Sequence, residues 1–160
     1  MPTRVAMMAP TELVKLVNEW GTLPRTADGR PPAPPHHELA TLADELHPVF
    51  AATTPSAQAA LVTALLQTTA VRPELTFIDK ALAASWLVED PAQRHRASAA
   101  LTLRHHLAEH PGRLGVCADP QCADVYIDAS PAGRRRFCCL TCQNRSRAAT
   151  FRRRRATPPP

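Results

Sequence analysis

Four cysteines in the last third of the chain constrain its fold more than any other feature. They are Cys117, Cys122, Cys138 and Cys142, arranged as C-x4-C, a gap of 15 residues and C-x3-C. Cysteine thiolates are strong zinc ligands, and two pairs on two turns can complete a tetrahedron around one ion. The spacing therefore predicts one structural zinc ion as the cofactor. With four protein ligands, such an ion has no open position for catalysis.

The second pair has two possible registers, because Cys138 and Cys139 are adjacent. Cys139 with Cys142 would give C-x2-C, which is also a zinc spacing. The chain has five cysteines, and all of them lie within residues 117–142. A disulfide framework normally pairs an even number of cysteines spread over a domain. The clustering instead favours a metal in a reducing compartment, and we expect a cytoplasmic protein.

The preceding residues, 1–112, predict a helical domain. Hydrophobic residues make up 44% of the sequence but aromatic residues only 4%, so a core must consist mainly of Ala, Leu and Val, which favours helices. Apolar residues at helical spacing predict helices over about residues 11–20, 39–48, 55–66, 81–88 and 91–109. Thr54 before Pro55 and Asp90 before Pro91 are predicted to cap two of these helices. Residues 22–37 are expected to be a proline-stiffened loop, and residues 71–80 fit either a loop or a strand. Trp20 and Trp86 are expected in the core.

Residues 113–157 predict a small zinc finger, followed by a short tail over residues 158–160. The first cysteine pair would lie on a knuckle, and residues 125–127 alternate in polarity as a half-buried strand does. A type I turn at residues 130–133 would return the chain as a second strand over residues 134–137. The finger would therefore contain a knuckle and a hairpin.

A helix is expected to complete the finger. From Leu140 onward no Gly or Pro interrupts the chain until Pro158, and Cys142 would lie in the first helical turn. A knuckle, a hairpin and a helix with ligands at both ends form a treble-clef-like arrangement. The predicted fold class is mainly α, with the helical N-terminal domain followed by this finger.

Charge divides the chain unevenly. Residues 1–128 contain ten Lys and Arg against fourteen Asp and Glu, whereas residues 129–160 contain nine Arg and no acidic residue. A basic end of this kind predicts an anionic polymer as partner, with DNA as the first candidate. The candidate nucleic-acid-binding residues are Arg134, Arg135, Arg136, Arg145, Arg147, Arg152, Arg153, Arg154 and Arg155.

The arrangement of these arginines favours one kind of contact. Arg152–Arg155 are consecutive and would cover all sides of a helix, which favours contact with phosphates over reading of bases. Arg145 has a second interpretation, because it could instead pin the finger's own backbone or a carboxylate such as Asp128. The arginines therefore predict phosphate binding, with a structural role for Arg145 left open.

Residues 114–155 resemble the CGNR zinc-finger family. The residues that carry this resemblance are Asp128, Ser130, Arg135, Arg136, Phe137, Cys138, Cys142, Asn144 and Arg145. The match of the aromatic-Cys step implies that Cys138, rather than Cys139, is the third ligand. The family's usual Gly before Asn-Arg is Gln143 here, which affects the expected start of the helix but not the ligands.

The stretch LVNEWGTLPR at residues 16–25 is similar to the ABATE domain that usually precedes this finger. Together the two resemblances imply a bacterial transcriptional regulator linked to stress. We expect the N-terminal domain either to sense a small-molecule signal, which the sequence does not identify, or to mediate contacts. These implications rest on resemblance to the family, and neither composition nor spacing supplies them.

Two other functions fit the same features of the finger. The finger could serve as an adaptor that docks an acidic protein, or it could bind RNA. No enzyme is expected, because there is no nucleophile motif or glycine-rich phosphate loop, and His106 and His110 lack a third ligand. No membrane partner is expected either, because the uncharged stretch at residues 46–71 contains prolines, His47 and several Thr and Gln.

Overall fold

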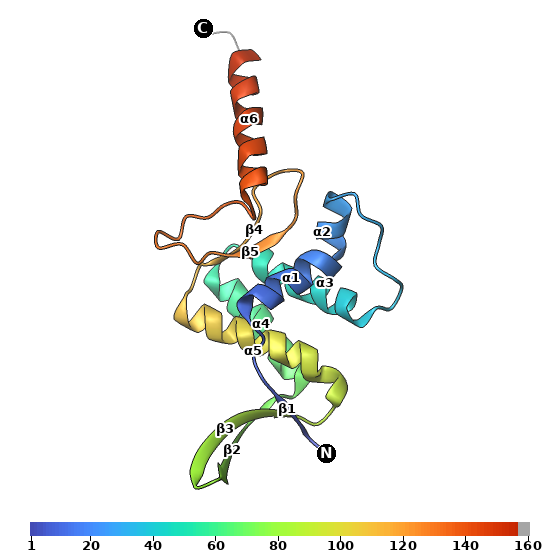
Figure 1. Cartoon of the computed structure of the whole chain (residues 1–160), viewed down its shortest axis with the longest axis vertical. Helices are drawn as coiled ribbons and strands as arrows, with labels where there is room; N and C mark the ends of the chain where they lie inside the picture. Colours follow the sequence, from blue (N-terminus) through green and yellow to red (C-terminus); the bar gives the residue numbers. More distant parts are fainter. Residues whose placement is uncertain (157–160) are drawn as a thin grey trace. The chain divides into compact units, whose positions relative to one another are not determined.

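The computed structural model describes residues 1–156, and the predicted tail together with residue 157 lies outside the described residues. The chain is mainly helical, as predicted, with two small sheets (Figure 1). Its elements in order are β1 (Thr3–Val5), α1 (Pro10–Trp20), α2 (Thr22–Ala27), α3 (Glu38–Ala51), α4 (Pro55–Thr69), β2 (Arg72–Ile78), β3 (Ala81–Val88), the 3-10 helix η1 (Pro91–Gln93), α5 (Arg94–Glu109), β4 (Leu114–Val116), β5 (Val125–Ile127) and α6 (Leu140–Ala156). No helix within residues 1–156 is both long enough and apolar enough to cross a membrane.

The helices and strands group into two compact units. The first unit contains Met1–Lys15 and Ala52–Gly112, and the second contains Leu16–Ala51 together with the chain from Arg113 onward. The second unit therefore combines α2, α3 and the end of α1 with the cysteine-bearing segment. The domain boundary expected at residue 112 remains a prediction.

The first unit packs α5 against a three-stranded sheet of order β1-β3-β2. A buried cluster of Val5, Val88, Ala97 and Leu101 forms its centre, and Trp86 is only partly buried against it. The N-terminal segment is also tied down by hydrogen bonds, because the hydroxyls of Ser98 and Thr102 on α5 donate to the backbone carbonyls of Ala6 (2.7 Å) and Met8 (2.9 Å).

The prediction of a helix over residues 81–88 is wrong, because these residues form β3. All seven residues of β2 pair with β3 in an antiparallel register that runs from Arg72↔Leu87 to Ile78↔Ala81. Asp79 and Lys80 between them have φ values of 49° and 64°, as both central residues of a type I′ hairpin turn require. The alanines of this stretch have the spacing expected of a helix. Its conformation is decided instead by pairing with β2, which is a tertiary interaction.

Sequence signals for two other helix starts are confirmed. The Thr54 hydroxyl accepts a hydrogen bond from the Ala57 N–H at 3.2 Å and caps α4. The Asp90 carboxylate accepts from the Ala92 N–H at 2.9 Å and caps the turn that leads into α5. A side-chain oxygen at this position satisfies an N–H that would otherwise lack an intrahelical partner.

Two other helix predictions are wrong. Residues 22–27 form α2 instead of a loop, and α3 continues through Pro48 to Ala51 instead of ending near that proline. The backbone N–H and the hydroxyl of Thr22 both donate to the Asp44 carboxylate, each at 2.7 Å. This contact with α3 fixes the start of α2, and no local sequence signal announces it.

The second unit holds β5 through side chains from two helices. The Asn18 amide on α1 donates to the Val125 carbonyl (3.0 Å), and its oxygen accepts from the Val125 N–H (2.7 Å), as a neighbouring strand would. On α3, the His47 ring Nε2 is hydrogen bonded to the Ala123 carbonyl at 2.9 Å. Both contacts anchor the segment that follows Cys122, so these helices position one side of the cysteine cluster.

Candidate metal centre and basic surface

The structure brings the four predicted cysteines together from two places in the second unit. Cys117 directly follows β4, and Cys122 closes the turn that leads towards β5. Cys138 precedes α6, and Cys142 lies in the first turn of that helix. Their four Sγ atoms all lie within 4.8 Å of one another.

The separations between sulfur atoms fit a shared metal ion. Cys138 Sγ lies 3.7 Å from Cys122 Sγ and 3.6 Å from Cys142 Sγ. A zinc ion with Zn–S bonds of about 2.3 Å in a tetrahedron places its sulfurs about 3.8 Å apart. A disulfide would need a separation of about 2.0 Å. The four cysteines can therefore hold one zinc ion.

Hydrogen-bond donors surround these sulfurs. The Cys138 N–H donates to Cys117 Sγ at 3.4 Å, and the Asp124 N–H donates to Cys122 Sγ at 3.5 Å. The Arg145 guanidinium donates to Cys142 Sγ, also at 3.5 Å. Donors in these positions orient metal ligands and stabilise thiolate charge.

Burial disfavours the charged form of Cys122, Cys138 and Cys142. Desolvation raises the pKa of Cys142 to about 12 and raises the pKa of Cys138 further. At Cys117 burial also opposes ionisation, but the backbone N–H of Cys138 brings the pKa below its ordinary value. A bound divalent cation reverses this balance because it deprotonates the thiols that coordinate it.

Cys139 lies outside the cluster. It is exposed, whereas Cys117 and Cys142 are buried, and the group of close sulfur atoms includes Cys138 and not Cys139. Of the two registers that the spacing allowed, the structure therefore places Cys138 among the clustered thiols.

Arg145 braces the centre. Its Nε lies 2.5 Å from Oδ2 of Asp119, a residue that is 2% exposed and lies on the first knuckle. The other carboxylate oxygen of Asp119 accepts from the Gln121 N–H at 3.0 Å. Hydrogen bonding by Gln121 and the charge of Arg145 hold the pKa of Asp119 below its ordinary value. The ion pair links the knuckle to α6, which fits the structural interpretation of Arg145, and its partner is Asp119 and not Asp128.

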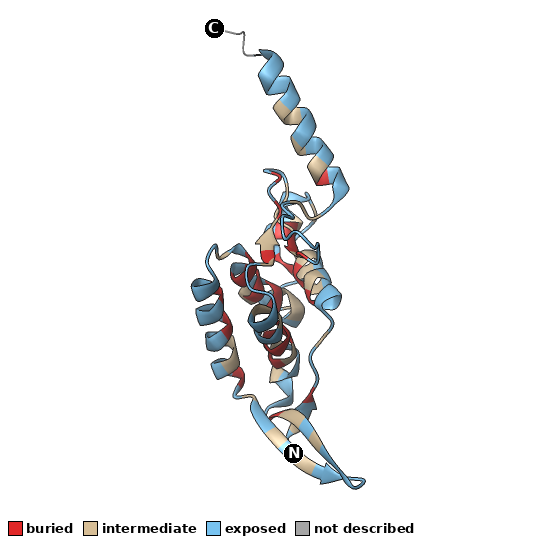
Figure 2. Ribbon diagram, turned by 90° about the vertical axis from the view of Figure 1, so that its left-hand side faces the viewer, coloured by how far each residue is buried: buried red, intermediate tan, exposed pale blue. Residues whose placement is uncertain are grey.

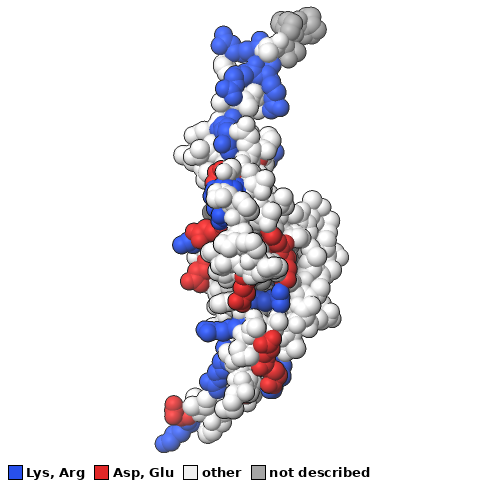
Figure 3. Space-filling model, turned by 90° about the vertical axis from the view of Figure 1, so that its right-hand side faces the viewer, with Lys and Arg blue, Asp and Glu red and all other residues white. Residues whose placement is uncertain are grey.

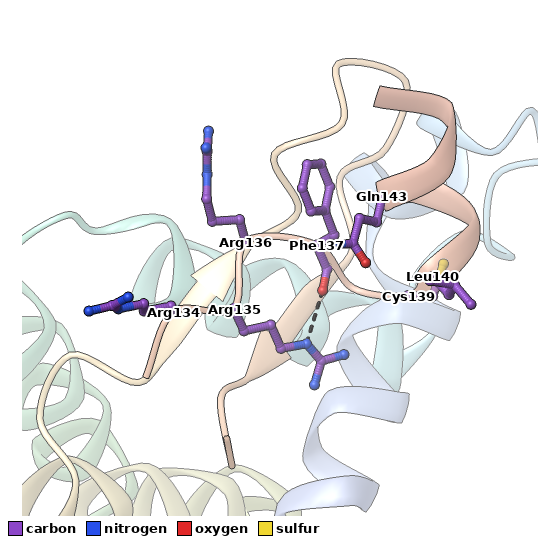
Figure 4. A pocket seen from close by; sticks show the side chains of 7 residues that line it. All are labelled: Arg134, Arg135, Arg136, Phe137, Cys139, Leu140 and Gln143. Carbon is purple, nitrogen blue, oxygen red and sulfur yellow. Dashed lines mark hydrogen bonds between the residues drawn. The ribbon is translucent and has the colours of Figure 1, made fainter. Parts of the chain in front are cut away.

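Arg135 is also engaged within the finger. Its guanidinium donates to the carbonyls of Phe137 (2.9 Å), Ile127 (3.3 Å) and Cys138, and it lies over the Tyr126 ring at 5.1 Å. Figure 4 shows this side chain pointing away from its neighbour Arg136 and bonded to Phe137. The Tyr126 hydroxyl donates to the Arg135 carbonyl at 2.7 Å. These contacts join β5 to the approach to Cys138.

The predicted strand over residues 134–137 is wrong, because β5 pairs with β4 and these residues form a loop. Asp128 shapes the loop: its carboxylate accepts from the backbone N–H groups of Ser130 and Arg135, both at 2.9 Å. Bonds from Ser130 and from the Arg135 N–H hold the pKa of Asp128 below its usual range. The buried Asp128 carboxylate therefore provides hydrogen bonds to the loop backbone in place of those that a second strand would make.

The remaining candidate arginines lie on the loop before α6 and on α6 itself. Within residues 1–156 the structure shows no partner for the exposed guanidinium groups of Arg134, Arg136, Arg147, Arg152 and Arg154. Arg153 reaches the Thr150 hydroxyl at 3.4 Å, and Arg155 lies over the Phe151 ring at 5.5 Å. Figure 3 shows basic side chains gathered over α6, a helix that contains no acidic residue.

An open hollow lies where the loop meets the start of α6 (Figure 4). Its volume is about 380 Å³, and the residues lining it are Arg134, Arg135, Arg136, Phe137, Cys139, Leu140 and Gln143. Because Arg135 is engaged with backbone carbonyls, Arg134 and Arg136 supply the uncommitted charge at this hollow.

Several residues that build the site were not predicted from sequence. Asn18 and His47 contact residues distant in the chain, and Tyr126 contacts Arg135 nine positions further on, so no local pattern marks their roles. Asp119 had a detectable signal, because it is an acidic residue on the knuckle of a segment rich in arginine.

The comparison with family models identifies the segment that holds this centre. The model of the CGNR zinc finger matches residues 113–155. No curated protein matches the chain. The similarity of the N-terminal residues to the ABATE domain remains a prediction. The cysteine-bearing segment, residues 113–155, is therefore identified by its match as a CGNR zinc finger whose four clustered cysteines can hold one zinc ion.

Proposed function

We propose that this protein is a bacterial transcriptional regulator of the cytoplasm whose zinc-organised finger binds duplex DNA. Zinc would give the finger its shape, and arginines on α6 and on the preceding loop would contact the phosphate backbone. The chain would have no enzymatic role, because an ion with four cysteine ligands has no position for a substrate or a water molecule. In fold terms, the first cysteine pair beside a hairpin and the second at the start of a helix support a treble-clef-like finger.

One observation carries the proposal. Five exposed arginines have no partner within residues 1–156, although acidic side chains elsewhere in the finger are engaged with Arg145 and Arg113. These five are Arg134, Arg136, Arg147, Arg152 and Arg154. Uncompensated charge concentrated on one segment favours a polyanion as partner. Arg135 and Arg145, which were predicted to bind nucleic acid, are better assigned to the finger's own framework.

The residues before the finger would receive the regulatory signal. A hollow of about 360 Å³ in the first unit is lined by apolar side chains of α4 and α5, including Val62, Leu66 and Leu107, with Arg104 as its charged residue. Mostly apolar pockets with a few polar groups are typical of small-molecule sites, which supports a sensing role for this unit.

A titration of zinc-loaded protein with duplex DNA over a range of salt concentrations tests DNA binding. If the five free arginines each neutralise one phosphate, the logarithm of the affinity should fall with the logarithm of salt at a slope of about −4.5. Arg136→Gln should reduce the magnitude of the slope by about 0.9. Arg94→Gln, which removes an exposed charge in the first unit, is the matched control and should leave it unchanged.

No binding at low salt would refute the proposal. Equal or tighter binding to structured RNA at the same salt concentration would replace it with an RNA-binding role. Binding that is confined to an acidic protein partner and resists nuclease treatment would favour the adaptor role.

A further inference from the structure

Helix α6 has no partner for most of its surface. It spans 17 residues, and Cys142 is the only buried residue among them. Figure 2 shows exposed residues along nearly its whole length. Helices of folded domains normally bury an apolar stripe, and a helix of this length extends about 25 Å. The surface of α6 is therefore available to a partner that the second unit does not itself supply.

The side chains of α6 differ between its two faces. At 100° per residue, Cys142 shares one face with Ser146, Ala149 and Thr150, all of them half-buried. The opposite face carries Asn144, Arg147, Ala148, Phe151 and Arg155, and every one of these is exposed. The outer face therefore combines amide, cationic and apolar side chains and does not consist of arginines alone.

This composition matches the edges of base pairs. An amide such as that of Asn144 can pair with both N6 and N7 of adenine, and a guanidinium such as that of Arg147 with O6 and N7 of guanine. The Ala148 methyl and the Phe151 ring, which is 60% exposed, can contact the thymine methyl group. The structure shows no partner for the Asn144 amide or the Arg147 guanidinium within residues 1–156.

Arginines flank this face on both sides. On the helical wheel, Arg152 falls on one flank of the outer face and Arg154 on the other, and both are exposed. A helix lying in a groove needs cations on both flanks, since a phosphate backbone borders the groove on each side. The consecutive arginines Arg152–Arg155 therefore do not prevent α6 from presenting a distinct outer face, because two of them lie on its flanks.

We propose that α6 is a recognition helix that enters the major groove of duplex DNA with Asn144, Arg147, Ala148 and Phe151 directed at base edges. This inference rests on the proposed DNA-binding function and assigns its groove and its reading residues. It moves Arg147 from the phosphate contacts to the base contacts, so four arginines remain for phosphates and the expected salt slope becomes about −3.6. An α-helix about 10–12 Å across fits the major groove, which is about 12 Å wide, and not the minor groove of about 6 Å. The major groove of A-form RNA is too deep and narrow to be read in this way.

Selection from a random-sequence duplex pool with the full-length, zinc-loaded protein provides the site for the test. Binding to the selected duplex is then compared with binding to a scrambled duplex. Asn144→Ala and Arg147→Ala should each reduce the preference for the selected site by about 5- to 150-fold, as expected for loss of a bidentate base contact. Arg154→Ala, the matched control, should weaken binding to both duplexes equally and leave the preference unchanged.

A second measurement tests the groove itself. Substitution of 7-deazaguanine and 7-deazaadenine removes the N7 acceptors of the major groove and should abolish the preference, whereas a minor-groove competitor such as netropsin should not displace the protein. Zinc content and helical circular dichroism confirm that each variant folds, which is expected because all of the altered residues are exposed.

The possible outcomes separate the two proposals. If the wild-type protein binds duplex DNA but keeps its preference in the Asn144 and Arg147 variants, or is displaced by netropsin, the recognition-helix assignment fails and the DNA-binding function stands. The same holds if selection yields no preferred site. If the wild-type protein fails to bind any duplex, or prefers structured RNA, the function and the assignment fail together.

Discussion

The first unit and the zinc finger keep their shapes by different means. The first unit has a buried aliphatic cluster at its centre, including Val88, Ala97 and Leu101. Within residues 113–156 the buried hydrophobic residues other than cysteine are Leu114, Val125 and Tyr126. In their place the finger uses a cluster of cysteines and charged side chains bound to its own backbone. Arginines in such a segment therefore serve two purposes: some stabilise the finger itself, and others remain exposed for a partner. Only their contacts in the structure distinguish the two groups.

Removal of zinc should produce the largest difference in stability between the two regions. Zinc binding contributes about 10–16 kcal/mol in finger peptides, so a chelator or Cys142→Ser should abolish the fold of residues 113–156. The cluster around Leu101 contains no residue of the finger. Hydrogen exchange measured by mass spectrometry should therefore show lost protection after residue 113 and retained protection in α5. Protection that persists throughout the zinc-free finger would contradict this account.

Leu101→Ala should produce the converse effect. Leu101 is 1% exposed, and truncation of a leucine in such a position typically costs about 2–5 kcal/mol. Amide exchange in α5 should accelerate while zinc content stays at one ion per chain. Leu61→Ala, at a residue that is 38% exposed, serves as the control and should have a much smaller effect. Loss of zinc from the Leu101 variant would show that the two regions are not stabilised separately.

Asp128→Asn should weaken the finger by a smaller amount. The folded-state pKa of Asp128 is lowered, first by the Ser130 hydroxyl, so its stabilising contribution is complete above the unfolded pKa and is lost as pH falls through the folded value. The ratio of zinc-release rates to a chelator, variant over wild type, should exceed one and stay constant between about pH 6 and pH 8. It should decline towards one only below about pH 4, near the unfolded pKa of an aspartate.

A ratio that changes markedly between those two neutral pH values would assign the effect to another group. Asp124→Asn provides a useful comparison, because burial raises the pKa of Asp124 instead of lowering it. That variant should not reproduce the pH profile of Asp128→Asn.

Cys139→Ser should have the smallest effect. Its side chain is exposed and lies outside the group of close sulfur atoms, so we expect unchanged zinc stoichiometry and an unchanged melting temperature. Cys138→Ser is the matched comparison and should lose the metal. Zinc loss in the Cys139 variant, with retention in the Cys138 variant, would reverse the assignment of the second pair.

Local patterns predicted those parts of the fold whose interactions are themselves local. The caps at Thr54 and Asp90 were recognisable because the capping side chain and the N–H that it binds lie two or three residues apart. The long helix after Leu140 was recognisable because nothing in its sequence interrupts it. By contrast, strand β3 was predicted as a helix, because seven pairings with β2, and not its own alanines, decide its conformation.

The candidate site likewise has features that the sequence predicts and features that only the structure shows. The four cysteines were predicted because zinc imposes its own spacing on a sequence, and the grouping of nine arginines after residue 128 is visible without any structure. The roles of those arginines could not be separated, because Arg135 and Arg145 are distinguished from their neighbours only by contacts with Tyr126 and Asp119.

The sequence alone determined that this chain carries a four-cysteine zinc segment with a basic end, because ligand type, ligand spacing and charge are properties of the residues themselves. The tertiary structure decided which thiol stays outside the cluster, which arginines brace the finger and which remain free, and which face of α6 is open. Those distinctions depend on distances between residues far apart in the chain, and such distances exist only once the chain has folded.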